Sequence, residues 1–246
     1  GKIRASWGQV LNSLSAYDLD TYYQVSDVFS TNPTMIVPNQ LKDPALHGAN
    51  NVEQEIGVEL RFLKNRIGAS VTYYARTNKD FPVAVSSTVA SGYSSLLTNA
   101  GEVKKTGIDV QAFVQLLKMK NVEYEINATW AYRLKNEVVA IAPGITRLVS
   151  ANGDYGPATT NPLSAWTVSE VGAEWGQLHG TGIKRINGKP VLNPDGTFVS
   201  EADVNYGSVL PRYTGGVQNT LTLFKNFVIG VNIDYSSGGK FFSLSN

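Results

Sequence analysis

The sequence contains no cysteine and only two histidines, His47 and His179. The absence of cysteine excludes disulfides and thiolate metal sites, and two histidines in separate loop-like segments do not form a metal-ligand motif. Nucleophile elbows of the Gly-x-Ser-x-Gly type and glycine-rich phosphate loops are also missing. Loop histidines and scattered carboxylates are usually solvated. We therefore expect no metal, no cofactor and no enzymatic activity.

An excess of charge of one sign is also lacking, because 21 Lys and Arg oppose 20 Asp and Glu. This balance argues against a nucleic-acid partner. Long apolar runs are absent too, since the longest, Val138 to Ala142, has five residues. A transmembrane helix is thereby excluded. A membrane β-barrel is not, because its strands alternate apolar and polar residues and have no long apolar run.

Alternation of apolar and polar residues with period 2 is the strongest pattern in the chain, and it predicts β-strands with one apolar and one polar face. The most regular stretch runs from Thr106 to Lys135 and predicts a long antiparallel hairpin. In total, seven strands are predicted, over Lys2–Val10, Glu55–Phe62, Ile67–Arg76, Thr106–Leu116, Val122–Lys135, Val217–Leu223 and Phe227–Tyr235.

The connections between these strands are alternately long and short, so all short turns fall at one end of the sheet and all long loops at the other. The turns lie at Lys64-Asn65, Lys118 to Asn121 and Lys225-Asn226. Inside the longest loop, Val138 to Pro211, the dipeptides Asn187-Gly188 and Asp195-Gly196 predict type I′ turns. We expect a small β-ribbon there, between Ile183 and Val199, and refer to it as the ribbon.

Two media can cover the apolar face of such a sheet: the core of a soluble protein or the lipid of a membrane. The segregation of turns from loops is typical of outer-membrane barrels. Aromatic residues also bracket two apolar stretches, Tyr124 with Tyr132 and Phe227 with Tyr235. Eight residues at about 3.3 Å each, tilted by about 40°, span roughly 20 Å, close to the height of an outer-membrane apolar band. Together these features favour lipid.

The parity of the strands assigns each side chain to a face. One set should share the apolar face toward lipid: Ile56, Val58, Leu60, Ile67, Val71, Ile108, Val110, Val114, Ile126, Val217, Leu221, Ile229 and Val231. A second set should point inward, to water or to a plug: Glu55, Glu59, Arg61, Arg76, Asp109, Gln111, Glu123, Glu125, Arg133 and Asp234.

Several blocks of the sequence resemble the SusC/RagA family of TonB-dependent outer-membrane transporters. They are Glu55-Ile56-Gly57-Val58-Glu59-Leu60, Thr98-Asn99-Ala100-Gly101-Glu102, Tyr213-Thr214-Gly215-Gly216 and Phe224-Lys225-Asn226-Phe227. The blocks occur in the family's order and cover nearly the whole chain. Lys2 to Gln9 is similar to the preceding strand, where tyrosine is commoner than Trp7.

The resemblance implies an all-β fold: an antiparallel transmembrane β-barrel segment, about seven strands of 22, with short periplasmic turns and long extracellular loops. It implies that residues 1–246 are a partial C-terminal barrel region, with the plug domain and the remaining strands absent. The implied function is import of oligosaccharides or peptides across a Bacteroidetes-type outer membrane. The implied partners are a SusD-like lipoprotein that lies as a lid over the loops, the TonB protein, the cargo and the lipid bilayer.

Ligand recognition should lie in the long loops, which are rich in Tyr, Trp, Asn and Asp. The candidate ligand-binding residues are Tyr22, Tyr23, Tyr155, Trp166 and Trp175. Packing within the loops is the alternative role for each. The alternative for the whole chain is a soluble carbohydrate-binding β-module, in which the same aromatics would stack on sugar rings.

Overall fold

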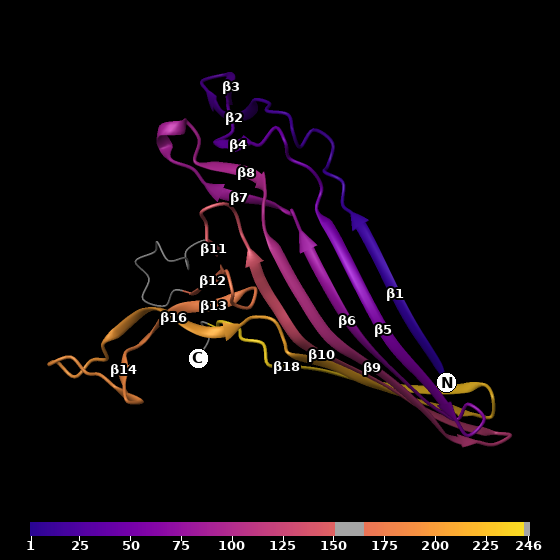
Figure 1. The fold of residues 1–246 in the computed structure, drawn as a ribbon. Coiled ribbons are helices and arrows are strands. Elements are labelled where there is room, and N and C mark those ends of the chain that lie inside the picture. The colour runs from indigo at the N-terminus through magenta and orange to yellow at the C-terminus, as the bar shows by residue number, and fades with distance from the viewer. Residues whose placement is uncertain (151–164, 244–246) are drawn as a thin grey trace.

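The computed structural model of the protein describes residues 1–150 and 165–243, and its main body is one antiparallel sheet (Figure 1). The seven strands are β1 (Lys2–Leu11), β5 (Asn50–Phe62), β6 (Ile67–Lys79), β9 (Glu102–Lys118), β10 (Val122–Ala140), β17 (Tyr213–Leu223) and β18 (Phe227–Ser237). Each pairs with the next in the order β1-β5-β6-β9-β10-β17-β18. The seven predicted strands and their sequential antiparallel pairing are confirmed.

Three short turns close one end of this sheet, as predicted, and we call it the turn end. Leu63, Lys64 and Asn65 all have positive φ, and so do Phe224 and Lys225. These left-handed residues reverse the chain within a few positions. The opposite end, where the long connections leave the sheet, is the loop end.

The strand register confirms the predicted faces. Residues opposite each other in neighbouring antiparallel strands point to the same side. Val58 lies opposite Val71, Val71 opposite Val110, and Val110 opposite Trp130. Neighbouring rows extend the same parity to β17 and β18. All thirteen residues of the apolar set share one face, and all ten residues of the polar set share the other.

A β-bulge corrects the sequence-based assignment of Lys135. Simple alternation puts Lys135 on the polar face with Arg133. The register of β10 against β9 shifts between these two residues, so that Arg133 lies opposite Gly107 but Lys135 lies opposite Thr106. Thr106 belongs to the parity of the apolar face, and the bulge therefore turns Lys135 to that side.

The long connections, which the sequence predicts as loops, contain small sheets of their own. β2 (Gln24–Phe29) pairs with β3 (Asn32–Ile36), and β4 (Gln40–Lys42), β8 (Ser95–Asn99) and β7 (Pro82–Ser86) form a three-stranded sheet. A four-stranded sheet contains β11 (Arg147–Ser150), β12 (Ala165–Glu170), β13 (Gln177–Ile183) and β16 (Ser200–Ser208). The 3-10 helix Val89–Ser91 is short, and no helix of the described residues is long and apolar enough to cross a membrane.

The ribbon is present and carries β14 (Arg185–Ile186) and β15 (Lys189–Pro190). Asn187 and Gly188 both have positive φ, which confirms the type I′ turn. At Asp195-Gly196 only the glycine has positive φ, so the predicted type I′ turn is wrong there. The Asp195 carboxylate instead accepts hydrogen bonds from the backbone N–H and the hydroxyl of Thr197, which holds a different turn.

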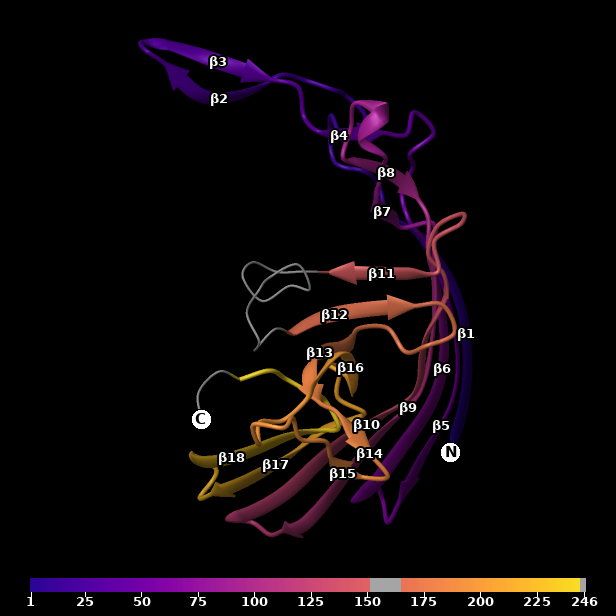
Figure 2. The same cartoon turned by 90° about the vertical axis from the view of Figure 1, so that its left-hand side faces the viewer.

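The sheet curves into an arc, and the four-stranded sheet lies on its concave side (Figure 2). Arg133, on the polar face, donates to the backbone oxygens of Leu210 and Pro211 and pairs with Glu174 at 3.5 Å. These contacts show that the polar face is the concave one. Buried Val83, Val85 and Ala100 form a small core at the loop end.

We predict that Gly107→Val impairs assembly of the sheet, because the Tyr74 ring lies over Gly107 where a Cβ would be. Such overpacking typically costs about 1–3 kcal/mol. The control is Gly8→Val, also on the concave face, where a Cβ would meet nothing within 4 Å. The temperature at which the full-length protein loses its folded mobility on gels should fall for Gly107→Val and stay unchanged for Gly8→Val. Equal effects would contradict this packing.

Candidate functional site

The convex face of the sheet is apolar and open. Ile56 is 56% exposed and Val231 52% exposed, although both lie in the middle of their strands. A contiguous apolar surface of this size is unfavourable in water and marks a contact with another apolar phase. The face lies on one sheet with no second layer of the described chain packed against it, so it does not form the core of a sandwich.

Aromatic side chains border this face toward the loop end. The rings of Trp130, Tyr132 and Tyr213 stack on one another, with 4.8 Å between the Tyr132 and Tyr213 centroids and 8° between their planes. Tyr235 covers Gly215 in the adjoining strand. Amphipathic rings at the border of an apolar band are typical of the membrane interface. We call this cluster the upper aromatic belt.

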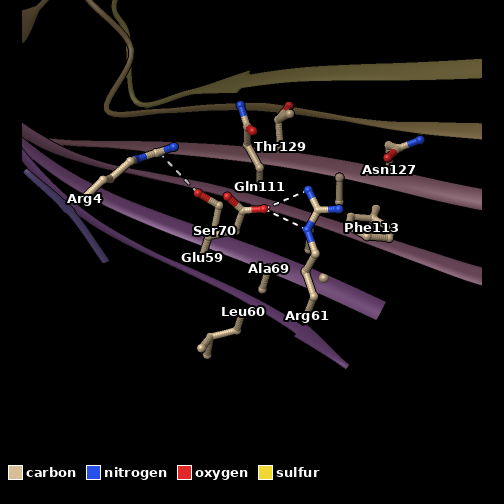
Figure 3. A pocket seen from close by; sticks show the side chains of 13 residues that line it. Arg4, Glu59, Leu60, Arg61, Ala69, Ser70, Gln111, Phe113, Asn127 and Thr129 are labelled. Carbon is tan, nitrogen blue, oxygen red and sulfur yellow. Dashed lines mark hydrogen bonds and ion pairs between the residues drawn. The ribbon is translucent and has the colours of Figure 1, made fainter. Parts of the chain in front are cut away.

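The concave face is polar and braced by contacts between strands (Figure 3). The Arg4 guanidinium of β1 crosses β5 above Gly57 and donates to Ser70 and Thr72 of β6. A side chain at Gly57 would meet Arg4 at 2.9 Å, so glycine leaves the path open. Arg61 donates to Glu59 at 2.8 Å and lies 5.8 Å from the Phe113 ring centroid.

Toward β18 the concave face carries mainly amide and hydroxyl side chains. They line two shallow hollows along the wall, and they include Gln111, Asn127, Thr129, Gln218 and Asn232. In Figure 3, Gln111 and Thr129 rise from the sheet on the side to which Arg4 and Arg61 reach, while Leu60 points away from it. Such a wall presents hydrogen-bonding groups to water or to a polar protein surface.

A charged cluster fastens the four-stranded sheet. Arg147 of β11 donates to both carboxylate oxygens of Asp203 in β16, at 2.7 and 2.6 Å. His179 of β13 is buried, and its Nδ1 lies 2.8 Å from Asp203 Oδ1. Partial burial raises the pKa of the Asp203 carboxyl, but the hydrogen bonds from His179 and Arg147 outweigh it and hold the pKa below its usual value. The cluster was not predicted, because its members are far apart in the sequence.

The predicted ligand-binding aromatics lie in different surroundings. Tyr22 and Tyr23 are exposed, and the Lys42 ammonium lies 5.5 Å from the Tyr22 ring centroid. Trp166 is only 8% exposed, opposite His179 in the sheet. Trp175 packs edge-on against Phe81, with 5.9 Å between centroids. Tyr155 lies outside the described residues. No ring contact in the described structure joins any two of these residues, and their role in binding stays a prediction.

The described residues contain no group of three His, Cys, Asp or Glu side chains that could hold a metal ion. The two faces of the sheet suit two different surroundings. The convex face fits lipid, the concave face fits water or polar protein, and the loops gather at one end. A curved antiparallel sheet with these properties is part of the wall of an outer-membrane β-barrel.

Comparison with known proteins identifies the family. The family model "TonB dependent receptor-like, beta-barrel" matches residues 2–241, and the chain therefore belongs to this family. Membership places the chain in the outer membrane of a Gram-negative bacterium and removes the alternative of a soluble carbohydrate-binding module. The resemblance to the barrel of the SusC/RagA family is thus confirmed.

The relatives agree with this assignment. The chain is 24% identical over 148 residues to the TonB-dependent receptor P39 of Formosa agariphila, a match that covers 57% of this chain and 14% of that protein. The RagAB peptide transporter has the same fold, with a TM-score of 0.71 and 19% identity over 95% of this chain. The RagAB peptide importer also matches in its "closed-closed" and "open-open" states, with TM-scores of 0.68 and 0.70. The chain spans 26% of each of these RagAB chains.

We predict that adjacent residues of β9 differ sharply in their tolerance of charge. Val110→Arg puts a guanidinium into the lipid and should cost about 2–4 kcal/mol near the mid-membrane. Gln111→Arg, one residue away on the concave face, should cost little. The yield of heat-resistant complete barrel in outer-membrane fractions measures both variants. Equal tolerance at the two positions would show that the faces are assigned wrongly.

We predict that Asp203 stabilises the four-stranded sheet in a pH-dependent way. Because folding lowers the pKa of its carboxyl, the stabilisation is present above the unfolded value of about 3.9 and is lost as pH falls through the lowered value. At neutral pH, Asp203→Asn should speed deuterium exchange in residues 177–183. Asp195→Asn, which removes a carboxylate bonded only within its own turn, is the control. Unchanged exchange in Asp203→Asn would mean that the cluster does not hold the sheet.

Proposed function

We propose that this chain forms part of the wall and of the extracellular mouth of an outer-membrane importer for oligosaccharides or peptides, energised through TonB. In this proposal residues 1–246 belong to the C-terminal half of a 22-stranded barrel that also contains a plug domain. The observation that carries the proposal is the shared parity of seven strands between their bulges, with lipid-compatible residues outside and a braced polar wall inside. The family match supports it.

The free edges of the sheet support the presence of further strands. β1 and β18 each pair on one side only. An edge of unpaired backbone N–H and C=O groups is not tolerated in lipid, so further strands of the same barrel would pair with both. The braced concave wall would then face the plug, and the plug's release through TonB would open the path for cargo.

A surface lipoprotein resembling SusD is the proposed partner at the loop end. The RagAB neighbours are two-component importers by name, which supports such a partner. Two elements protrude from the loop end in Figure 1: the β2–β3 hairpin and the ribbon. Both expose large apolar side chains, among them Phe29 and Met35 on the hairpin and Ile186 and Phe198 on the ribbon. A protein partner would bury these side chains.

The cargo is proposed from the same loops. Exposed Tyr22 and Tyr23 offer faces on which a sugar ring or a peptide side chain can stack. The named neighbours import peptides, which favours peptide, whereas the relative P39 carries no cargo in its name. The relative P39 comes from Formosa agariphila, and this source supports a Bacteroidetes-type outer membrane as the location of the present chain.

We predict that deletion of the ribbon between Ile183 and Val199 in the complete transporter leaves barrel assembly normal and reduces lipoprotein co-purification. A finer pair is Ile186→Ser with Lys189→Ser as control, since these two residues face each other across the ribbon. Only Ile186→Ser removes apolar surface. If the deletion and both variants match the parent in co-purification and in uptake, the ribbon binds neither the lid nor the cargo.

Transport itself is tested by measuring uptake of defined peptides and oligosaccharides in cells with and without TonB. The proposal expects uptake of one of these classes, and expects that loss of TonB abolishes it. Uptake that persists without TonB would identify a passive pore instead. Absence of uptake for both classes, with a correctly assembled barrel and bound lipoprotein, would contradict the proposed cargo.

A further inference from the structure

A group of lysines stands on the convex face just beyond the upper aromatic belt. Lys79 of β6, Lys104 of β9 and Lys135 of β10 all share the parity of the apolar face. Tyr73 lies on β6 with Lys79, and Tyr132 lies on β10 with Lys135. Both tyrosines share the lysines' face and lie nearer the turn end. We call the three lysines and the two neighbouring carboxylates, Glu102 and Glu137, the outer rim.

The carboxylates of the outer rim hold the lysines in place. Lys79 and Lys104 both pair with Glu102, at 3.9 and 3.4 Å, and Lys135 pairs closely with Glu137. The lysine side chains remain 47%, 50% and 55% exposed, whereas the carboxylates are 22% and 26% exposed. The lysine side chains are therefore more accessible from outside than the carboxylates with which they pair.

The bulge in β10 is what brings the third lysine to this surface. Without the register shift after Arg133, Lys135 would point to the concave side, as Arg133 does. Asn136 would then point to the convex side. The shift instead leaves Asn136 buried, with its backbone oxygen accepting a hydrogen bond from the Trp175 N–H, and sends Lys135 out to the rim. Bulges commonly re-aim a side chain at a functional surface.

We propose that the outer rim binds the phosphate groups of anionic lipids in the outer leaflet of the outer membrane. The rim is continuous with the lipid-facing band and lies just beyond its aromatic border, at the height where headgroups begin. It lies on β6, β9 and β10 in the middle of the sheet (Figure 1), so strands added at β1 or β18 do not cover it. Ammonium groups on flexible stems suit phosphates as point charges.

Hydroxyl and amide groups that can bond to a phosphorylated sugar headgroup lie on the same part of the convex face. They belong to Thr77, Thr106 and Gln54.

The contribution of the outer rim to lipid binding should be substantial. Each lysine near an anionic surface contributes about 1 kcal/mol, close to a fivefold change in affinity. The paired carboxylates offset part of this. We expect a loss of about tenfold or more when all three lysines are neutralised.

The test uses the complete transporter in phosphatidylcholine nanodiscs titrated with lipid A, a diphosphorylated disaccharide lipid. The variant is Lys79→Gln with Lys104→Gln and Lys135→Gln, and the control is Lys64→Gln with Lys118→Gln and Lys225→Gln at the turn end. The thermal stabilisation by lipid A should require about tenfold more lipid in the variant and the same amount in the control. Replacement of the three rim lysines by arginine should preserve binding, which separates lost charge from misfolding.

Four outcomes would overturn the proposal. An unchanged lipid response in the rim variant would show that the rim does not contact lipid A. An equal loss in the control would mean unspecific attraction. Equal stabilisation by inorganic phosphate, in competition with lipid A, would assign a site for free phosphate. Loss of lipoprotein co-purification with an unchanged lipid response would assign the rim to a protein partner.

Discussion

Backbone polar groups that lie in lipid must be hydrogen-bonded within the protein, because lipid offers them no partner. A sheet satisfies its N–H and C=O groups only through neighbouring strands, so seven strands must stay in register over the height of the apolar band. Because side chains alternate along a strand, that register also fixes which residues meet lipid. The row Val58, Val71, Val110 and Trp130 shows the constraint at work, since one slipped strand would place polar side chains in lipid.

Structural requirements differ between the wall and the loop end. The wall uses cross-strand braces such as Arg4 over Gly57, which tie three strands together without closing the concave side. The loop end uses small sheets fixed by local cores and by the cluster around Asp203. Similar TM-scores to the RagAB importer in two differently named states agree with a wall whose fold is the same in both.

Much of the wall could be predicted from the sequence, because alternation and short turns are local signals. The strand ends and the bulge at Lys135 could not, since an extra residue shows only when the partner strand is known. Pairings within the long loops are also non-local, and the cluster of Arg147, His179 and Asp203 leaves no periodic trace. Burial in the long loops depends on these non-local pairings as well. From the sequence Trp166 is a candidate ligand-binding residue, and only the fold shows that its side chain is buried.

One face of this sheet meets lipid and the other does not, and site-directed labelling tests this difference directly. Residues 1–246 contain no cysteine, so after replacement of any cysteine elsewhere in the complete transporter, single cysteines can be placed at each position from Ile108 to Val114 and labelled with a fluorophore. Quenching by brominated lipids should alternate, strong at positions 108, 110, 112 and 114 and weak at 109, 111 and 113. Uniform quenching, or quenching of the opposite parity, would show that the convex face is not the one in lipid.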